Sequence, residues 1–250
     1  MKEQIYTIPV NEVYDTDCEC PLCELEKKLE KETLDCALGA AMMEPEFRME
    51  SNEKGFCNHH CSMLFGMSNK LTLSLVLDTH LEEIRKKLDT LKKSASALKN
   101  QKGGLFKKTG SADFSKALSE KLDGISDGCV VCDKINHTME RYADVLLYMW
   151  ANDEKFKEKF NKSKGVCLKH MKLLVDTVPK SLKDSQAAQF LACLFEKQEA
   201  ELSRIQEDIH KFTLKFDYRN KDMEWGTAQD APIRTIDKIS AFINNDYEEK

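Results

Sequence analysis

The chain reads Cys20-Pro21-Leu22-Cys23 and, after a gap of 33 residues, Cys57-Asn58-His59-His60. The same pattern returns as Cys129-Val130-Val131-Cys132 and, after a gap of 34 residues, Cys167-Leu168-Lys169-His170. Each CxxC precedes a helical stretch, and each CxxH follows a Lys-Gly-apolar turn. Self-similarity at matched spacing is typical of an internal duplication. We therefore predict two pseudo-repeated halves, each built around one CxxC and one CxxH.

Within each half, this pattern indicates a metal site. A CxxC turn aims two sulfurs at one point, and residues three apart on a helix lie on the same face. Together the two pairs supply three thiolates and one imidazole, a standard closed shell for zinc. We predict one structural Cys3His site per half, and hence two Zn²⁺ per chain. The predicted ligands are Cys20, Cys23, Cys57 and His60 in the first half, and Cys129, Cys132, Cys167 and His170 in the second.

Comparison of the two halves also indicates which of the remaining histidines and cysteines are not ligands. The second half offers a histidine only three residues after its cysteine, which selects His60 over His59. Cys18, Cys36 and Cys61 have no cysteine counterpart, so we exclude them. An iron–sulfur cluster is the alternative, although such clusters usually take four cysteines. A dithiol redox pair of thioredoxin type would need a βαβ context, which the sequence pattern lacks.

Composition favours an all-α fold. The 250 residues are 41% hydrophobic and 32% charged, a soluble globular balance. Only 10 Gly and 5 Pro occur, few for a fold with many turns. Apolar residues recur at helical spacing over 24–43, 71–91, 190–212 and 231–243. The predicted organisation is a first metal-binding repeat (1–93), a linker (94–111), a second metal-binding repeat (112–215), and a C-terminal segment with a helix (216–250).

Charge and targeting signals limit the expected classes of partner and the expected location. The formal net charge of −5 argues against a generally basic nucleic-acid binder. The stretch Arg85–Lys108 holds nine basic residues and one acid, so nucleic acid is a possible partner there. A solvated helix face and linker is the favoured interpretation. The chain shows no secretory signal and no apolar run of membrane-spanning length, so we expect a cytoplasmic protein without a membrane partner.

No catalytic constellation stands out, so a non-enzymatic function is favoured. We predict a binding or scaffold module in which metal sites hold helices that present a surface to a protein partner. The competing hypothesis is a redox-responsive or metal-responsive protein, with Cys18 and Cys61 as its extra thiols. The stretch Trp225–Arg234 has a structural interpretation, because Asp230 suits a helix N-cap and Pro232 suits a first helical turn.

Four segments carry a resemblance that spans nearly the whole chain. They are IPVNE (8–12), DCECPLCELEKKLEKE (17–32), GFCNHH (55–60) and WGTAQDAPIRTIDK (225–238). With its duplicated CxxC and CxxH motifs, the chain resembles an uncharacterised bacterial family of Firmicutes type. The resemblance implies a cytosolic bacterial protein, and it implies no activity because no function is established for that family. An anaerobic source would strengthen the iron–sulfur alternative.

Overall fold

The computed structural model describes residues 4–99, 111–126 and 128–241 of the chain. The regular secondary structure of these residues is entirely helical, so the all-α prediction is confirmed. The α-helices are α1 (Gln4–Val13), α2 (Pro21–Ala37), α3 (Pro45–Lys54), α4 (Asn58–Gly66), α5 (Lys70–Lys99), α6 (Ser111–Ser126), α7 (Val130–Asn152), α8 (Glu154–Lys162), α9 (Leu168–Ser181), α10 (Asp184–Lys215) and α11 (Ala231–Ser240). The shorter 3-10 helices are η1 (Ala40–Met43), η2 (Tyr218–Asn220) and η3 (Gly226–Ala228).

The long helices lie where the apolar periodicity predicts them. The stretch 71–91 lies within α5, and 190–212 lies within α10. The stretch 231–243 begins as α11, which ends at Ser240 because Ala241 takes a positive φ of 66°, and residues 242 and 243 lie outside the described residues. The stretch 24–43 is interrupted, since α2 ends at Ala37 and η1 begins at Ala40. Gly39 permits this break, because a Cβ there would lie 2.8 Å from the carbonyl oxygen of Asp35.

Helix starts follow local side-chain chemistry. The Asp153 carboxylate accepts hydrogen bonds from the backbone N–H groups of Lys155 and Phe156, which caps α8. Asp230 stands at the N-cap position of α11, as predicted, with Pro232 in the first turn. The Asp230 carboxylate makes no capping bond, however, and instead accepts a hydrogen bond of 2.8 Å from Arg234 Nε.

The chain divides into two compact units. Unit 1 comprises Met1–Lys28 and His137–Lys250, and unit 2 comprises Leu29–Asn136. These units do not coincide with the predicted segments 1–93, 112–215 and 216–250, because the boundaries fall inside α2 and α7. In addition, α5 extends through Lys99 into the predicted linker, of which 100–110 lies outside the described residues.

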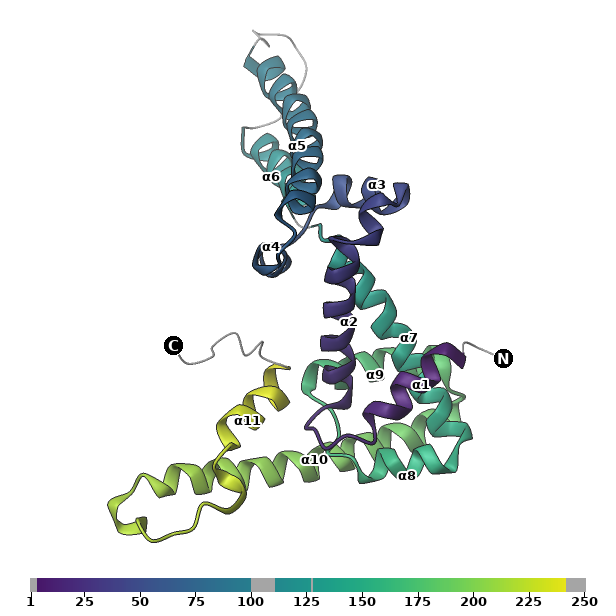
Figure 1. Cartoon of the computed structure of the whole chain (residues 1–250), viewed down its shortest axis with the longest axis vertical. Helices are drawn as coiled ribbons and strands as arrows, with labels where there is room; N and C mark the ends of the chain where they lie inside the picture. The colour runs from purple at the N-terminus through teal and green to yellow at the C-terminus, as the bar shows by residue number, and fades with distance from the viewer. Residues whose placement is uncertain (1–3, 100–110, 127, 242–250) are drawn as a thin grey trace. The chain divides into compact units, whose positions relative to one another are not determined.

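Unit 1 is built on an aromatic core. The ring of Phe190 lies 5.1 Å from that of Trp150 and 5.7 Å from that of Phe160, between ring centroids. Tyr14, directly after α1, packs edge-on against Phe156 at 5.1 Å. Burying each Phe side chain contributes about 1.5–3 kcal/mol. The long helix α10 (green in Figure 1) contacts both α9 and α11 in this unit.

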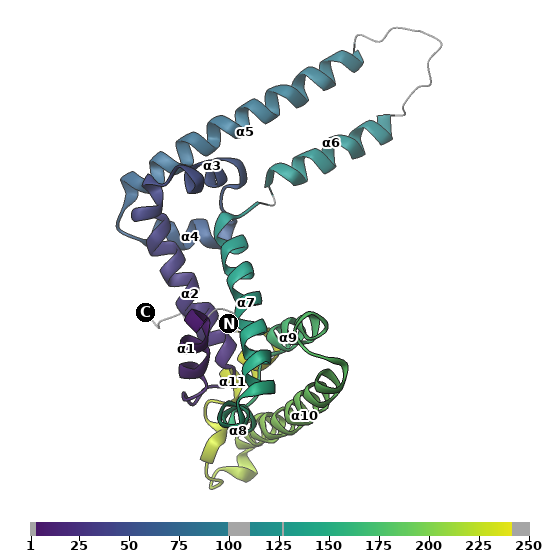
Figure 2. The same ribbon diagram turned by 90° about the vertical axis from the view of Figure 1, so that its right-hand side faces the viewer.

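Unit 2 has an aliphatic core and one long arm. Leu64 of α4 and Val76 of α5 are fully buried, and α3 packs along α5. Figure 2 shows α6 running back alongside α5. Beyond the core, α5 leaves Leu77, Leu81 and Leu88 between 39% and 55% exposed. Across the described residues of both units, no helix is long and apolar enough to cross a bilayer.

Candidate metal centres

Unit 1 contains a fully buried group of four donor atoms, which we call centre A: Cys20, Cys23, Cys167 and His170. The Nδ1 atom of His170 lies 3.4 Å from Cys20 Sγ, 3.4 Å from Cys23 Sγ and 3.3 Å from Cys167 Sγ. The sulfurs of Cys23 and Cys167 are 3.6 Å apart. No residue of the group is more than 5% exposed. The three sulfurs therefore surround one imidazole nitrogen out of contact with solvent.

Unit 2 contains a second such group, which we call centre B: Cys57, His60, Cys129 and Cys132. The Nδ1 atom of His60 lies 3.2 Å from the sulfurs of Cys57 and Cys129, and 3.4 Å from that of Cys132. The Cys57 and Cys132 sulfurs are 3.8 Å apart. His60 and Cys129 are buried, whereas Cys57 and Cys132 are partly exposed. Centre B repeats the donor chemistry of centre A in a less enclosed setting.

The spacing of these donors fits a single tetrahedral ion. With Zn–S and Zn–N bonds of about 2.3 and 2.05 Å, ligand sulfurs lie about 3.8 Å apart, and a sulfur and a nitrogen about 3.6 Å apart. The observed separations are 3.6 and 3.8 Å between sulfurs, and 3.2–3.4 Å between sulfur and nitrogen. In both centres the donors could therefore hold one metal ion with displacements of a few tenths of an ångström.

Matching backbone turns place the CxxH pairs. Gly55 and Gly165 precede the two turns with φ angles of +67° and +77°, in the region that favours glycine. A Cβ at Gly55 would also lie 2.2 Å from His80 Nε2. Cys57 and Cys167 then take extended φ and ψ as N-caps of α4 and α9. The helix start carries the following histidine onto the same face as its cysteine.

Two carboxylates from α2 lie beside the two histidines. Glu30 Oε1 is hydrogen-bonded to His60 Nε2 at 3.1 Å, whereas Glu26 Oε2 lies 3.4 Å from His170 Nε2, which has no hydrogen-bond partner among the described residues. At centre B, this bond leaves His60 Nδ1 to face the sulfurs, in the tautomer that a metal would bind. Hydrogen bonding from His60 lowers the pKa of Glu30, despite its partial burial. Sequence reasoning missed both residues, although Glu26 follows the ligand Cys23 by one helical turn.

The charges at centre A favour a thiolate. Burial opposes protonation of His170, but hydrogen bonds with Cys167 and Cys23 and the nearby Glu26 carboxylate outweigh it and raise the pKa of His170 to about 11. Hydrogen bonds from Cys20 and Cys23 hold the pKa of Cys167 far below its usual range. Burial raises the pKa of Cys20. One thiolate paired with one imidazolium is thus preferred, and a metal ion would take the place of the proton.

Centre B has the same electrostatic arrangement. Burial opposes protonation of His60, but hydrogen bonds with Cys129 and Glu30 raise its pKa to about 10. Burial would raise the pKa of Cys129, but the hydrogen bond with His60 outweighs it and lowers that pKa to about 6. The pKa of Cys132 is raised, first by burial and then by Cys129. Cys129 is therefore the thiolate of this centre, the form that binds metal.

All eight predicted donors are brought together, but the predicted pairing is wrong. Each CxxC meets the CxxH of the other half: Cys20 and Cys23 lie with Cys167 and His170, and Cys129 and Cys132 with Cys57 and His60. The sequence could not decide this, because both CxxH pairs have identical chemistry. The 17 residues of α2 extend about 26 Å along the helix axis, and the CxxH pair that follows in the sequence joins Cys129 and Cys132 instead.

The surplus donors lie outside both groups. His59 contacts Glu30 Oε1 at 3.0 Å through Nε2, whereas His60 faces the sulfurs. Cys18 contacts Thr16 Oγ1 at 3.5 Å, and Cys61 donates to the carbonyl oxygen of Phe56. Cys36, Cys18 and Cys61 are free thiols and are absent from the four-donor groups that the described residues form.

Two other stretches noted in the sequence make side-chain contacts within the described residues. In Arg85–Lys108, Lys86 pairs with Glu83 and Lys93 with Asp89 on exposed helix surface, and residues 100–108 lie outside the described residues. In Trp225–Arg234, the Trp225 ring packs 5.4 Å from that of Phe212, between centroids. These contacts involve only part of each stretch, and a nucleic-acid partner stays a prediction.

Comparison with known proteins gives a family but no activity. No curated protein and no solved structure matches the chain. The resemblance to an uncharacterised family is confirmed by a family model that matches residues 1–246, nearly the whole length. By that match, the chain belongs to the Family of unknown function (DUF6062).

Proposed function

We propose that the protein is a zinc-binding helical module in which centres A and B each hold one structural Zn²⁺. The observation that carries this proposal is centre A, where three sulfurs and one imidazole nitrogen converge at ligand spacing with at most 5% exposure. A buried cluster of thiols is costly to leave unpaired, and a metal ion would satisfy all four donors together. Centre B supports the same assignment with the same donor set.

A structural role is favoured over a catalytic one. Catalytic zinc keeps one coordination position for water or substrate, whereas four protein donors fill a tetrahedral shell. The described residues also form two surface grooves, and none of the eight donors lines either of them, so neither groove gives a substrate access to a metal centre. One groove includes Arg141, Asp144 and Ser181, and the other includes Cys18, Lys155 and Lys159. The chemistry that the ion would supply is therefore cross-linking of segments, here α2 with α9 in unit 1 and α4 with α7 in unit 2.

Zinc is favoured over an iron–sulfur cluster by donor number and spacing. Each centre offers three cysteines, whereas clusters usually take four. The sulfurs lie 3.6–3.8 Å apart, as around one ion, and a cluster would distribute its thiolates over separate iron atoms. Thiolate ligands need a reducing compartment, which supports the cytoplasm as the location. As a binding or scaffold module, the protein would present its helical surfaces to a protein partner.

The proposal predicts a metal content of two zinc ions per chain. We expect protein purified without oxygen to contain 2 mol of zinc per mol of chain by elemental analysis, and to have no visible absorption. Substitution with Co²⁺ should give the intense d–d bands of a tetrahedral thiolate site. Iron with acid-labile sulfide would instead establish the iron–sulfur alternative, and folded protein without metal would refute metal binding.

The extra thiols provide a control for this result. Cys18→Ser and Cys61→Ser, singly and together, should leave the zinc content at two, because neither sulfur belongs to a donor group. The redox hypothesis predicts that these variants change the metal content or its loss on oxidation by peroxide.

The carboxylates behind the histidines give a second prediction. Glu30→Gln should weaken zinc binding at centre B by about 10–100-fold, because the His60 Nε2–H would lose its charged acceptor. Glu26→Gln should weaken centre A less, because Glu26 lies 3.4 Å from His170 Nε2 without forming a hydrogen bond. The matched control is Glu32→Gln, an exposed carboxylate on the same helix. Competition with a chromophoric chelator measures each affinity, and equal affinities for the Glu30 and Glu32 variants would contradict the orienting role.

A further inference from the structure

At centre B, a backbone hydrogen bond joins the CxxC segment to the CxxH segment. The Val130 N–H, directly after Cys129, donates to the carbonyl oxygen of Gly55 at 3.1 Å. The two segments lie so close that a Cβ at Gly128 would be 2.5 Å from the carbonyl oxygen of Lys54. At centre B, the backbones of the two ligand-bearing segments are therefore hydrogen-bonded directly to each other.

Centre A cannot form this bond. The residue after its first cysteine is Pro21, which has no N–H to donate. The residue before that cysteine is Glu19, whereas centre B has Gly128 at the same place. The close approach of the segments seen at centre B is therefore not available, and the carbonyl groups on both segments need another donor.

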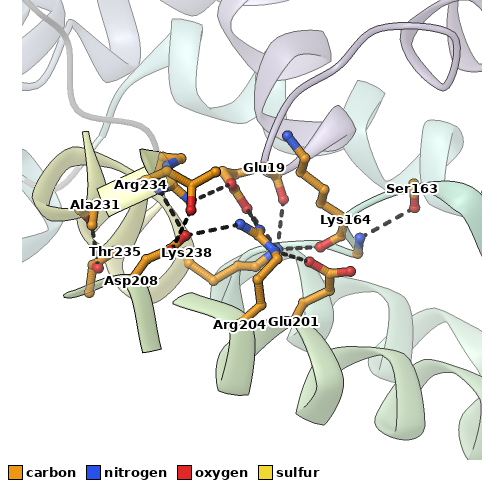
Figure 3. Close-up of polar contacts among 12 residues, drawn as sticks. Glu19, Ser163, Lys164, Glu201, Arg204, Asp208, Ala231, Arg234, Thr235 and Lys238 are labelled. Atoms are coloured by element: carbon orange, nitrogen blue, oxygen red, sulfur yellow. Dashed lines mark hydrogen bonds and ion pairs between the residues drawn. The ribbon is translucent and has the colours of Figure 1, made fainter. Parts of the chain in front are cut away.

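At centre A, a buried lysine from α11 is the hydrogen-bond donor to both segments. The Lys238 side chain is 0% exposed, and its Nζ donates to the carbonyl oxygens of Glu19, at 2.8 Å, and Lys164. Glu19 directly precedes Cys20, the first residue of the CxxC motif. Lys164 directly precedes Gly165, in the turn that leads into the CxxH motif. Figure 3 shows the Lys238 side chain reaching between the two segments. One ammonium group thus bridges the two segments that carry all four donors of centre A.

The surrounding charges explain why a lysine is tolerated there. A buried ammonium is costly unless it is paired and hydrogen-bonded. Lys238 Nζ lies 3.7 Å from the Glu19 carboxylate, which also accepts a hydrogen bond of 2.6 Å from Arg204. Arg234 pairs with Asp208 at 3.0 Å and so ties α11 to α10 (Figure 3). A Zn²⁺ with three thiolates carries a net negative charge, which the ammonium would offset.

We propose that Lys238 is the positioning residue of centre A, where its ammonium replaces the backbone hydrogen bond that Pro21 removes. This inference rests on the proposed zinc function. It makes the C-terminal helix α11 a part of one metal centre, while centre B needs no such helix. The two zinc ions of one chain should therefore differ in their dependence on Lys238.

The test is zinc affinity in the full-length chain, measured by chelator competition that resolves the two ions. Lys238→Met should weaken one ion by about 10–100-fold, the usual effect of losing a group that orients metal ligands, and leave the other unchanged. Val130→Pro, which removes the backbone donor at centre B, should weaken only the other ion. The combined variant should weaken both ions.

Two further variants separate positioning from general stability. Arg204→Met removes another cation beside Glu19 but keeps both carbonyl bonds of Lys238, so zinc affinity should stay within about 3-fold of wild type. Pro21→Val together with Glu19→Gly gives centre A both the N–H and the glycine of centre B, and in the Lys238→Met background this pair should recover at least part of the lost affinity. Circular dichroism on every variant reports whether the fold is retained.

The measured affinities separate a failure of the Lys238 role from a failure of the proposed zinc function. Wild-type protein without zinc would overturn the proposed function. Two zinc ions in wild type, with unchanged affinities in Lys238→Met, would overturn only the role of Lys238. The role is also overturned if Arg204→Met weakens binding as much as Lys238→Met, or if Pro21→Val together with Glu19→Gly recovers nothing.

Discussion

Removing zinc is expected to unfold the protein. Structural Cys/His sites supply about 10–16 kcal/mol of apparent binding free energy, whereas folded domains are stable by only about 5–15 kcal/mol in total. Without the ions, each centre is left with three cysteines and one histidine that no metal joins, and centre A is fully buried. We therefore expect the chelated chain to lose most of its helical signal and its cooperative thermal transition.

The measurement is far-ultraviolet circular dichroism during titration with a strong zinc chelator under reducing conditions. Returning two equivalents of Zn²⁺ should restore the helical signal, and Mg²⁺, which prefers oxygen ligands, should not. A chelated chain that keeps its transition midpoint within a few degrees would show that the hydrophobic cores suffice without metal. That result would reduce the two centres from structural cross-links to accessory sites.

Local structure was predictable from the sequence where one chemical rule dominates. Apolar spacing placed α5 and α10, because a long helix must bury one face. The break after α2 depends on the close approach of Gly39 to Asp35, which the apolar pattern does not record. The helix α1, which contains Pro9, was not predicted, and Tyr14 directly after it completes the aromatic core of unit 1.

The donor set was predictable, and the connections between donors were not. CxxC and CxxH spacings identify ligands because three-residue separation fixes a common face. Which CxxC meets which CxxH depends on contacts between residues 144 and 75 positions apart in the chain, and that is a long-range property. Lys238 lies far along the chain from Cys20 and carries no motif, so its contact with Glu19 depends on the fold alone. The same is true of Glu30, whose role requires that α4 packs on α2.

The crossed pairing of donors can be tested by counting ions in double variants. Cys23→Ser should remove one zinc ion, and Cys167→Ser should remove the same ion, because both sulfurs belong to centre A. The combination Cys23→Ser with Cys167→Ser should therefore still lose only one ion. The combination Cys23→Ser with Cys57→Ser should lose both ions, because Cys57 belongs to centre B.

Pairing within each half would give the opposite result, since Cys23 and Cys57 would then share one ion. Elemental analysis after dialysis against a moderate chelator distinguishes the two schemes, because for each double variant one scheme predicts one ion and the other predicts none. Cys61→Ser is the matched control: its sulfur lies beside centre B but outside the donor group, so both ions should remain. Should the Cys23 and Cys57 double variant keep one ion, the crossed arrangement would be refuted, and with it the assignment of Lys238 to a centre that joins α2 with α9.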